Sequence, residues 1–145
     1  MRIMAGKKNS FFSFIEMIAI LLILAILTLV TVGHLGSSDV RAVSEAAIIK
    51  NHLRYAQAKS MVDDNAEWGI VFSAGSYTLQ KDGSAAGKLP NESGPTHVLQ
   101  GLTIASGTGA ITFDQWGSPG IVTRTITLSK DGQTVTITKN TGFIP

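Results

Sequence analysis

Residues that could perform chemistry are sparse in this sequence, and they do not form a known catalytic or metal-binding pattern. There is no cysteine, and the three histidines lack the spacing of a zinc site. They are His34, His52 and His97. No nucleophile can be matched with a base and an orienting acid. We therefore expect no enzymatic activity, no catalytic residue, no metal and no other cofactor.

Two short motifs invite a functional interpretation. Asp114 beside Trp116 could contact a carbohydrate or a substrate, but we favour the interpretation that Phe113 and Trp116 are packing or turn residues. Gly107-Thr-Gly109 lacks the third glycine and the following lysine of a phosphate-binding loop, and it lies between predicted strands. Neither motif predicts a binding site.

The clearest chemical signal is Glu16, an acid inside an apolar run. The run extends from Phe11 to Val32, and Glu16 is its only charged residue. An acid costs on the order of 2.5–3.5 kcal/mol near the centre of a bilayer and less near its edge. No lysine or arginine occurs between Lys8 and Arg41, so the same helix offers no basic partner. Either Glu16 reaches water near the headgroups, or its partner is another chain or a terminal amine.

The apolar run itself predicts a single membrane-spanning helix. As a helix, its 22 residues extend over roughly 33 Å, close to the hydrocarbon thickness of a bilayer. Three basic residues precede it, which predicts a cytoplasmic N-terminus and an exported remainder. They are Arg2, Lys7 and Lys8. A cleavable secretory signal is the alternative, but it would need a shorter apolar core and a better cleavage site than Gly33-His-Leu-Gly36.

The sequence Phe12-Ser-Phe-Ile-Glu16 and the apolar residues after it resemble the start of type IV pilins and type II secretion pseudopilins. The resemblance implies a leader at residues 1–11, removed between Phe11 and Phe12 by a prepilin peptidase that then methylates the new amine. It implies that Glu16 pairs with the amine of a neighbouring subunit. The implied partners are other pilin subunits, the peptidase, an inner-membrane assembly platform and the lipid bilayer. The implied location is the bacterial inner membrane, with a periplasmic C-terminal domain that assembles into a filament.

One position departs from the pattern of the resembled family. The family has glycine before the cleaved bond, whereas this chain has Phe11, and Gly6 is too far upstream. Cleavage between Ser10 and Phe11 would place a smaller residue there but make Glu16 the sixth residue. Shifted cleavage and an unprocessed, membrane-anchored β domain therefore stay open as alternatives.

A second helix is predicted beyond the apolar one. We expect the first helix at residues 12–33. Gly33 and Gly36 mark either a hinge or a simple helix end at the start of the segment 34–64. The rest of that segment is expected to form an amphipathic helix from Ser38 or Asp39 to about Val62. Its apolar residues recur at spacings of three and four. They are Val40, Val43, Ala46, Ala47, Ile49, Leu53 and Ala56.

Residues 65–145 predict an antiparallel β domain, because apolar residues alternate with a period of two. Expected strands lie around Trp68–Phe72, Tyr77–Leu79, Leu102–Ile104 and Ile111–Phe113, and a final hairpin turns at Lys130-Asp-Gly132. We expect residues 84–98 to form a long loop. The predicted class is α+β, with a long hydrophobic helix that continues into the amphipathic helix and packs on an antiparallel sheet.

Motifs in the outer part resemble a subgroup of the same family. Leu53-Arg-Tyr-Ala-Gln-Ala-Lys59, Ile111-Thr-Phe-Asp-Gln-Trp-Gly117 and Val135-Thr-Ile with Gly142 are similar to GspH/FimT-type pseudopilins and to minor pilins of the mannose-sensitive haemagglutinin class. The resemblance implies a structural minor subunit that helps to initiate a filament or occupies its tip. The machine could be a secretion system, an adhesive pilus or a DNA-uptake apparatus.

A DNA-binding minor pilin is the competing interpretation. Part of a basic helical face could come from Arg41, Lys50, Arg54 and Lys59. However, nine basic and nine acidic residues follow Ser38, so the outer domain is formally neutral. Binding to phosphates favours a basic excess, and this balance argues against nucleic acid as a partner.

Overall fold

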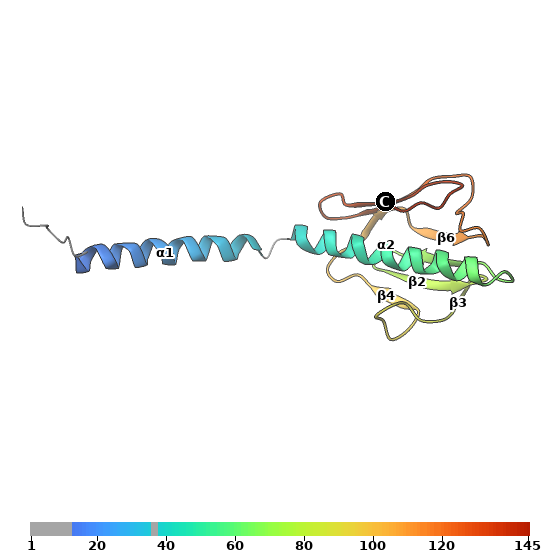
Figure 1. Cartoon of the computed structure of the whole chain (residues 1–145), viewed down its shortest axis with the longest axis horizontal. Coiled ribbons are helices and arrows are strands. Elements are labelled where there is room, and N and C mark those ends of the chain that lie inside the picture. Colours follow the sequence, from blue (N-terminus) through green and yellow to red (C-terminus); the bar gives the residue numbers. More distant parts are fainter. Residues whose placement is uncertain (1–12, 36–37) are drawn as a thin grey trace, which may run out of the picture. The chain divides into compact units, whose positions relative to one another are not determined.

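The computed structural model describes residues 13–35 and 38–145 (Figure 1). The chain divides into two compact units, Met1–Ser37 and Ser38–Pro145. The first contains helix α1 (Phe14–Leu35), and the second contains helix α2 (Ser38–Val62) and all the strands of the described chain. The predicted leader, together with Phe12 and Gly36, lies outside the described residues.

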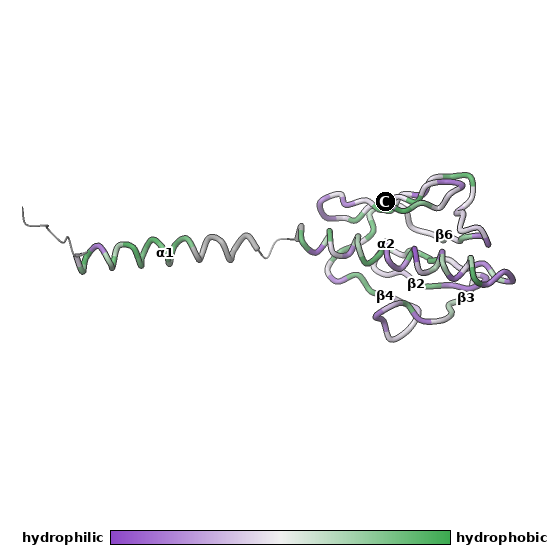
Figure 2. Tube along the Cα trace, viewed as in Figure 1, coloured by the Kyte–Doolittle hydropathy of each residue, from purple (hydrophilic) through white to green (hydrophobic). Residues whose placement is uncertain are grey.

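Helix α1 is apolar around its whole circumference. Of its described side chains, every large apolar one between Phe14 and Leu27 is exposed, and Figure 2 shows this part of the helix almost entirely as hydrophobic. The helix continues through Gly33 to Leu35, two residues beyond the predicted end of the first helix. In the described part of the chain, no helix combines the length and apolarity required to cross a membrane.

Helix α2 ends at Val62, as the sequence predicts. Its buried side is rotated from the predicted stripe, because Val40, Val43 and Ala47 are exposed. The buried positions recur every three or four residues, as one side of an α-helix requires. They are Ala42, Glu45, Ala46, Ile49, His52, Leu53, Ala56 and Ser60. Three polar side chains therefore replace apolar ones on the side that packs.

The larger sheet has five antiparallel strands. They are β1 (Trp68–Phe72), β2 (Ser76–Lys81), β3 (Ser84–Ala85), β4 (Thr96–Val98) and β6 (Gly109–Phe113). The order is β3-β2-β1-β6, and β4 also pairs with β2. The first hairpin, β1–β2, forms as predicted. The segment 84–98 is not only a loop, because β3 and β4 lie at its two ends.

The smaller sheet consists of β5 (Ile104–Ser106), β7 (Arg124–Leu128) and β8 (Thr134–Ile137), in the order β5-β7-β8. The predicted β7–β8 hairpin is confirmed. The expectation of one sheet is wrong, since β5 pairs with β7 while β6 pairs with β1. The two strands that flank Gly107-Thr-Gly109 thus belong to different sheets.

One hydrophobic core joins α2 to both sheets. The helix contacts β1 and β6 of the larger sheet and β8 of the smaller one. Leu53, Tyr77, Phe113 and Val135 are fully buried, and they come from α2, β2, β6 and β8 respectively. The architecture is α+β, with α2 packed on antiparallel sheets. The core rather than any loop therefore fixes the position of every side chain on the buried face of α2.

Candidate functional site

The most unusual local chemistry is a buried polar cluster between α2 and the larger sheet. It comprises Glu45 and His52 on α2, Tyr77 on β2, Glu92 on the β3–β4 connection and His97 on β4. We call these five residues the His97 cluster. Glu45, His52, Tyr77 and His97 are buried, and Glu92 is half-buried. No buried side-chain nitrogen or oxygen in the described chain is left without a hydrogen-bond partner.

The register of the sheet explains how the rings meet. Tyr77 of β2 lies directly opposite His97 of β4, and their rings stack with centroids 4.9 Å apart. Nδ1 of His52 lies 2.8 Å from the Tyr77 hydroxyl oxygen, and Nε2 of His52 lies 3.0 Å from the Pro90 carbonyl oxygen. The ring of His97 lies between two carboxylates: its Nδ1 is 2.6 Å from Glu92 Oε1, and its Nε2 is 3.1 Å from Glu45 Oε2.

Burial changes the titration of two members of this cluster. It lowers the pKa of His52 below the usual 6.5, since the charged ring is poorly solvated there. Burial also raises the pKa of Tyr77 far above its ordinary 10.0, and the nearby carboxylates of Glu45 and Glu92 add to this effect. His52 and Tyr77 are therefore neutral near pH 7.

A second cluster surrounds the Trp68 indole at the C-terminal end of α2. Nζ of Lys59 lies 5.1 Å from the ring centroid and Nζ of Lys81 lies 5.5 Å from it, both within the range of cation–π contacts. The indole N–H donates to Asp63 at 3.1 Å, and Lys81 donates to the same oxygen at 2.7 Å. The hydrogen bond from Lys81 holds the pKa of Asp63 below its usual value, and the indole hydrogen bond adds to this effect.

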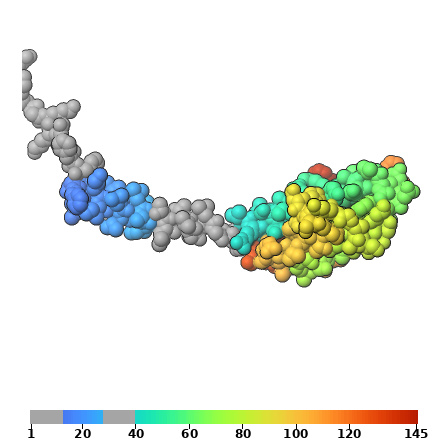
Figure 3. Space-filling view, turned by 90° about the horizontal axis from the view of Figure 1, so that it is seen from below, coloured from blue at the N-terminus to red at the C-terminus, as the bar shows by residue number. Residues whose placement is uncertain are grey.

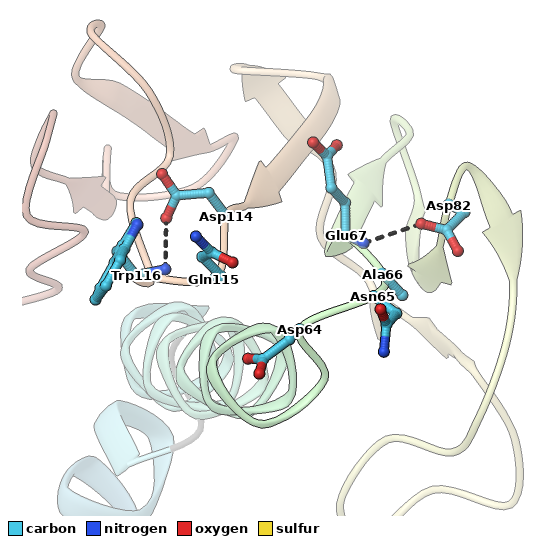
Figure 4. Close-up of a pocket in the computed structure, with 8 residues that line it drawn as sticks. All are labelled: Asp64, Asn65, Ala66, Glu67, Asp82, Asp114, Gln115 and Trp116. Carbon is cyan, nitrogen blue, oxygen red and sulfur yellow. Dashed lines mark hydrogen bonds between the residues drawn. The ribbon is translucent and has the colours of Figure 1, made fainter.

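An open hollow of about 560 Å³ adjoins this end of the helix (Figure 4). Its lining includes Asp64, Glu67, Asp82 and Asp114, together with Trp116. The carboxylate of Asp114 accepts hydrogen bonds from the backbone N–H groups of Trp116 (2.9 Å) and Ser118 (2.8 Å), as in an Asx turn. Asp114 is thus a turn residue, whereas Trp116 is 79% exposed and does not pack in the core.

Across residues 13–35 and 38–145, no group of three or more histidine, aspartate or glutamate side chains is arranged to hold a metal ion. The four carboxylates of the hollow come from separate segments and do not converge on one point (Figure 4). Two of them, Asp82 and Asp114, accept hydrogen bonds from backbone N–H groups. The hollow is a shallow acidic surface beside an exposed indole.

Comparisons with known proteins identify the architecture. No protein-family model matches the chain, and no curated protein matches it. A solved structure does match: the crystal structure of the type IV minor pilin FimU from Pseudomonas aeruginosa, with a TM-score of 0.51 at 19% sequence identity. The match covers 70% of this chain and 89% of that chain. The chain has a pilin-like fold.

Glu16, the predicted assembly residue, lies in the first turn of α1. Its backbone N–H donates to the carbonyl of Ser13 at 2.9 Å, and its side chain is exposed in the single chain. An acid is favourable at this end of a helix, because the first N–H groups carry partial positive charge. The predicted cleavage residues Phe11 and Phe12 lie outside the described residues, and the role of Glu16 in assembly stays a prediction.

The predicted hinge residues receive different outcomes. Gly33 is helical within α1, and Gly36 lies in the pair of residues, 36–37, for which no placement is described. Whether the two helices form one continuous helix, as the sequence suggests, therefore stays a prediction.

The four basic residues considered for DNA do not lie on one face of α2. At 3.6 residues per turn, Arg41 and Lys59 face the same direction about five turns apart, while Lys50 and Arg54 face roughly the opposite side. Arg54 donates to the Ile144 carbonyl at 2.9 Å, and Lys59 lies against Trp68. Two of the four cations are thus engaged within the domain.

The His97 cluster was missed by the sequence interpretation, which placed His52 and His97 in unrelated segments. A signal existed, since Glu45 and His52 are seven residues apart and so lie on one side of a helix, among residues that pack. The part contributed by Glu92 and His97 depends on how the β3–β4 connection returns to the sheet, which no local pattern encodes.

Proposed function

We propose that this chain is a structural minor pilin or pseudopilin, a subunit whose apolar N-terminal helix enters the core of a filament and whose α+β domain is displayed outside. The observation that carries the proposal is the pilin-like fold of the domain behind an apolar helix with a single acid. FimU, the matched structure, is a type IV minor pilin.

The surface of α1 supports a role in association. A helix that is apolar all round is stable only where lipid or other protein covers it. Its exposed side chains include Phe14 (80%), Ile15 (75%) and Leu21 (64%). The α+β domain has a complete core of its own. What the chain lacks is a cover for α1, and the bilayer before assembly and neighbouring subunits after it would provide one.

In this proposal, Glu16 selects the register of assembly. A carboxylate in apolar surroundings is strongly destabilising unless it is paired. The N-terminal amine of an adjacent processed subunit would supply the opposite charge. We further propose that residues 1–11 are a leader removed by a prepilin peptidase. Before assembly, the chain would be anchored in the bacterial inner membrane beside an assembly platform, with its domain in the periplasm. The motif resemblance favours the GspH/FimT subgroup and a place at the filament tip.

Replacement of Glu16 by leucine tests the proposal. We expect Glu16→Leu to remain in the membrane at the normal level and to be lost from sheared filaments, measured by immunoblotting both fractions. Leu22→Ala is the matched control, since it changes the same helix without removing a charge, and it should be incorporated. Normal incorporation of the Glu16→Leu protein would contradict the proposal.

Processing is tested separately by mass spectrometry of the N-terminal peptide from membrane-isolated protein. A methylated Phe12 at the N-terminus is the expected result. An intact start at Met1 or Arg2 would instead favour the unprocessed membrane anchor.

A further inference from the structure

The connection between β3 and β4 is attached to α2 through the His97 cluster. Figure 3 shows this connection, in yellow, as a raised mass on the surface beside α2. Two backbone hydrogen bonds fix its base. Within the connection, the N–H of Leu89 donates to the Gly94 carbonyl at 3.0 Å, and from β2 the N–H of Leu79 donates to the Pro95 carbonyl at 2.8 Å. Two side-chain hydrogen bonds connect the tip, residues 90–94, to the rest of the domain: one from His52 to the Pro90 carbonyl, and one between Glu92 and His97.

The hydrogen-bonding partners determine where the protons are. A carbonyl oxygen only accepts, so Nε2 of His52 carries the proton and donates to Pro90, and Nδ1 accepts from the Tyr77 hydroxyl. An ionised carboxylate likewise only accepts, so both ring nitrogens of His97 must donate, one to Glu92 and one to Glu45. His52 is therefore neutral, and both contacts of His97 are hydrogen bonds only in the imidazolium form of its ring.

We propose that His97 is a pH-sensitive latch: its protonated ring bonds Glu92 and Glu45 at once and so holds the tip of the β3–β4 connection against α2. If His97 loses a proton, one nitrogen presents a lone pair to a carboxylate oxygen, and two negative groups face a neutral ring. The tip, which has the fewest other attachments, then opens.

Among residues 13–35 and 38–145, no lysine or arginine forms an ion pair with Glu45, Glu92 or His97. From α2, Glu45 and His52 face His97; from β2, Tyr77; and from the connection, Glu92. Arg41 lines a neighbouring hollow with Glu45, but its side chain is exposed.

Opening would change the surface of the domain at one place. A hollow of about 350 Å³ lies between α2 and the tip, lined by Ile48, Asn51 and His52 on the helix and by Pro90, Asn91 and Glu92 on the tip. All three lining residues of the tip belong to the segment that the latch releases. Loss of the proton would thus widen this hollow and expose the helix surface beneath it.

Nuclear magnetic resonance of the full chain in detergent micelles tests the protonation states directly. The ring-nitrogen shifts at pH 6 should show two protonated nitrogens for His97 and one for His52. A neutral His97 at pH 6 would overturn the proposal.

Hydrogen exchange of the full chain, measured by mass spectrometry and corrected for intrinsic rates, tests the motion. Between pH 6 and pH 9 we expect protection of residues 89–94 to fall about tenfold, as expected for the loss of a charge-assisted hydrogen bond. In Glu92→Gln this dependence should disappear, since an amide can bond the neutral ring. Glu67→Gln, an exposed carboxylate replaced in the same way, should respond as the wild type does. An unchanged response in Glu92→Gln, or constant protection in the wild type, would overturn the latch.

Discussion

The two helices have similar lengths but opposite relations to their surroundings. Helix α1 has 22 residues and α2 has 25. Helix α1 has one acid and exposes its large apolar side chains from Phe14 to Leu27, whereas α2 buries one side that includes Glu45, His52 and Ser60. Each of these three polar residues has a partner within the domain, and Ser60 donates to the Phe113 carbonyl. Polar groups on a buried helix face are tolerated where the fold supplies their partners.

The two helices differ in where their side chains find partners. The buried side of α2 packs on the two sheets, and its buried polar side chains have hydrogen-bond partners within the domain. The domain therefore needs no other chain to bury its core. The requirements of α1 are not met by the described chain: it offers apolar surface and a carboxylate, and both call for external partners. The proposed assembly through α1 therefore uses a part of the chain that the core of the domain does not need.

The largest effect should come from removing core volume on α2. Leu53 is fully buried, so Leu53→Ala should lower the free energy of unfolding by roughly 2–5 kcal/mol. The measurement is urea denaturation in micelles, followed by the fluorescence of the buried Trp68. Leu22→Ala on α1, where the side chain is 60% exposed, should leave the midpoint unchanged. Equal losses in the two variants would break the comparison between the helices.

A smaller effect should follow from crowding the C-terminal segment against α2. The side-chain amide of Gln57 donates to the carbonyls of Gly117 (2.7 Å) and Gly142 (3.0 Å). A Cβ on Gly142 would lie 2.0 Å from the Gly117 oxygen, at a φ of +63°. Gly132 has a similar φ but open space around it. In the same urea assay, Gly142→Ala should lower the free energy of unfolding by roughly 1–3 kcal/mol more than Gly132→Ala does. Similar losses in the two variants would show that the backbone moves to accommodate the added Cβ without strain.

The smallest effect concerns pH and separates the buried titratable group of α2 from the exposed one of α1. The pKa of His52 lies below 6.5 in the folded state, so its contribution to stability is fully present above about pH 6.5 and is lost as the pH falls through the lowered value. A fall of the pH from 7.5 to 5 should therefore lower the urea midpoint of the wild type relative to that of His52→Gln. Glu16→Gln should leave the pH dependence of the urea midpoint unchanged. A changed pH dependence would show that α1 unfolds together with the domain.

Much of the fold follows from local patterns. The boundary of α2 at Val62, the β1–β2 hairpin and the β7–β8 hairpin were all predictable, since each depends on residues close in sequence. The Asp131-Gly132 turn has positive φ at both residues, as its dipeptide indicates. The same dipeptide at Asp82-Gly83 also turns a hairpin, although its second strand, β3, is only two residues long.

The errors have a common cause, which is pairing between distant segments. Nothing local distinguishes β5, which joins β7, from β6, which joins β1, since both are short runs of alternating residues. The buried side of α2 was rotated in the prediction because Val40 and Val43 are apolar, while the side that packs includes Glu45 and His52. Their partners, His97 and Tyr77, come from strands that no helical period reveals. The predicted assembly residues depend on other chains and not on this fold.

The outer edge of β2 has a consequence for how copies of this domain can meet. Three residues of that edge, Ser76–Thr78, pair with β4, and Gln80 and Lys81 pair with β3. Between them, the N–H of Leu79 donates to Pro95 and its carbonyl accepts from Ala86. Neighbouring chain therefore covers this side of β2 along its whole length, and an incoming strand from another molecule finds no template on it. At this border the domain resists the edge-to-edge stacking that leads to aggregates, even when many copies are crowded together.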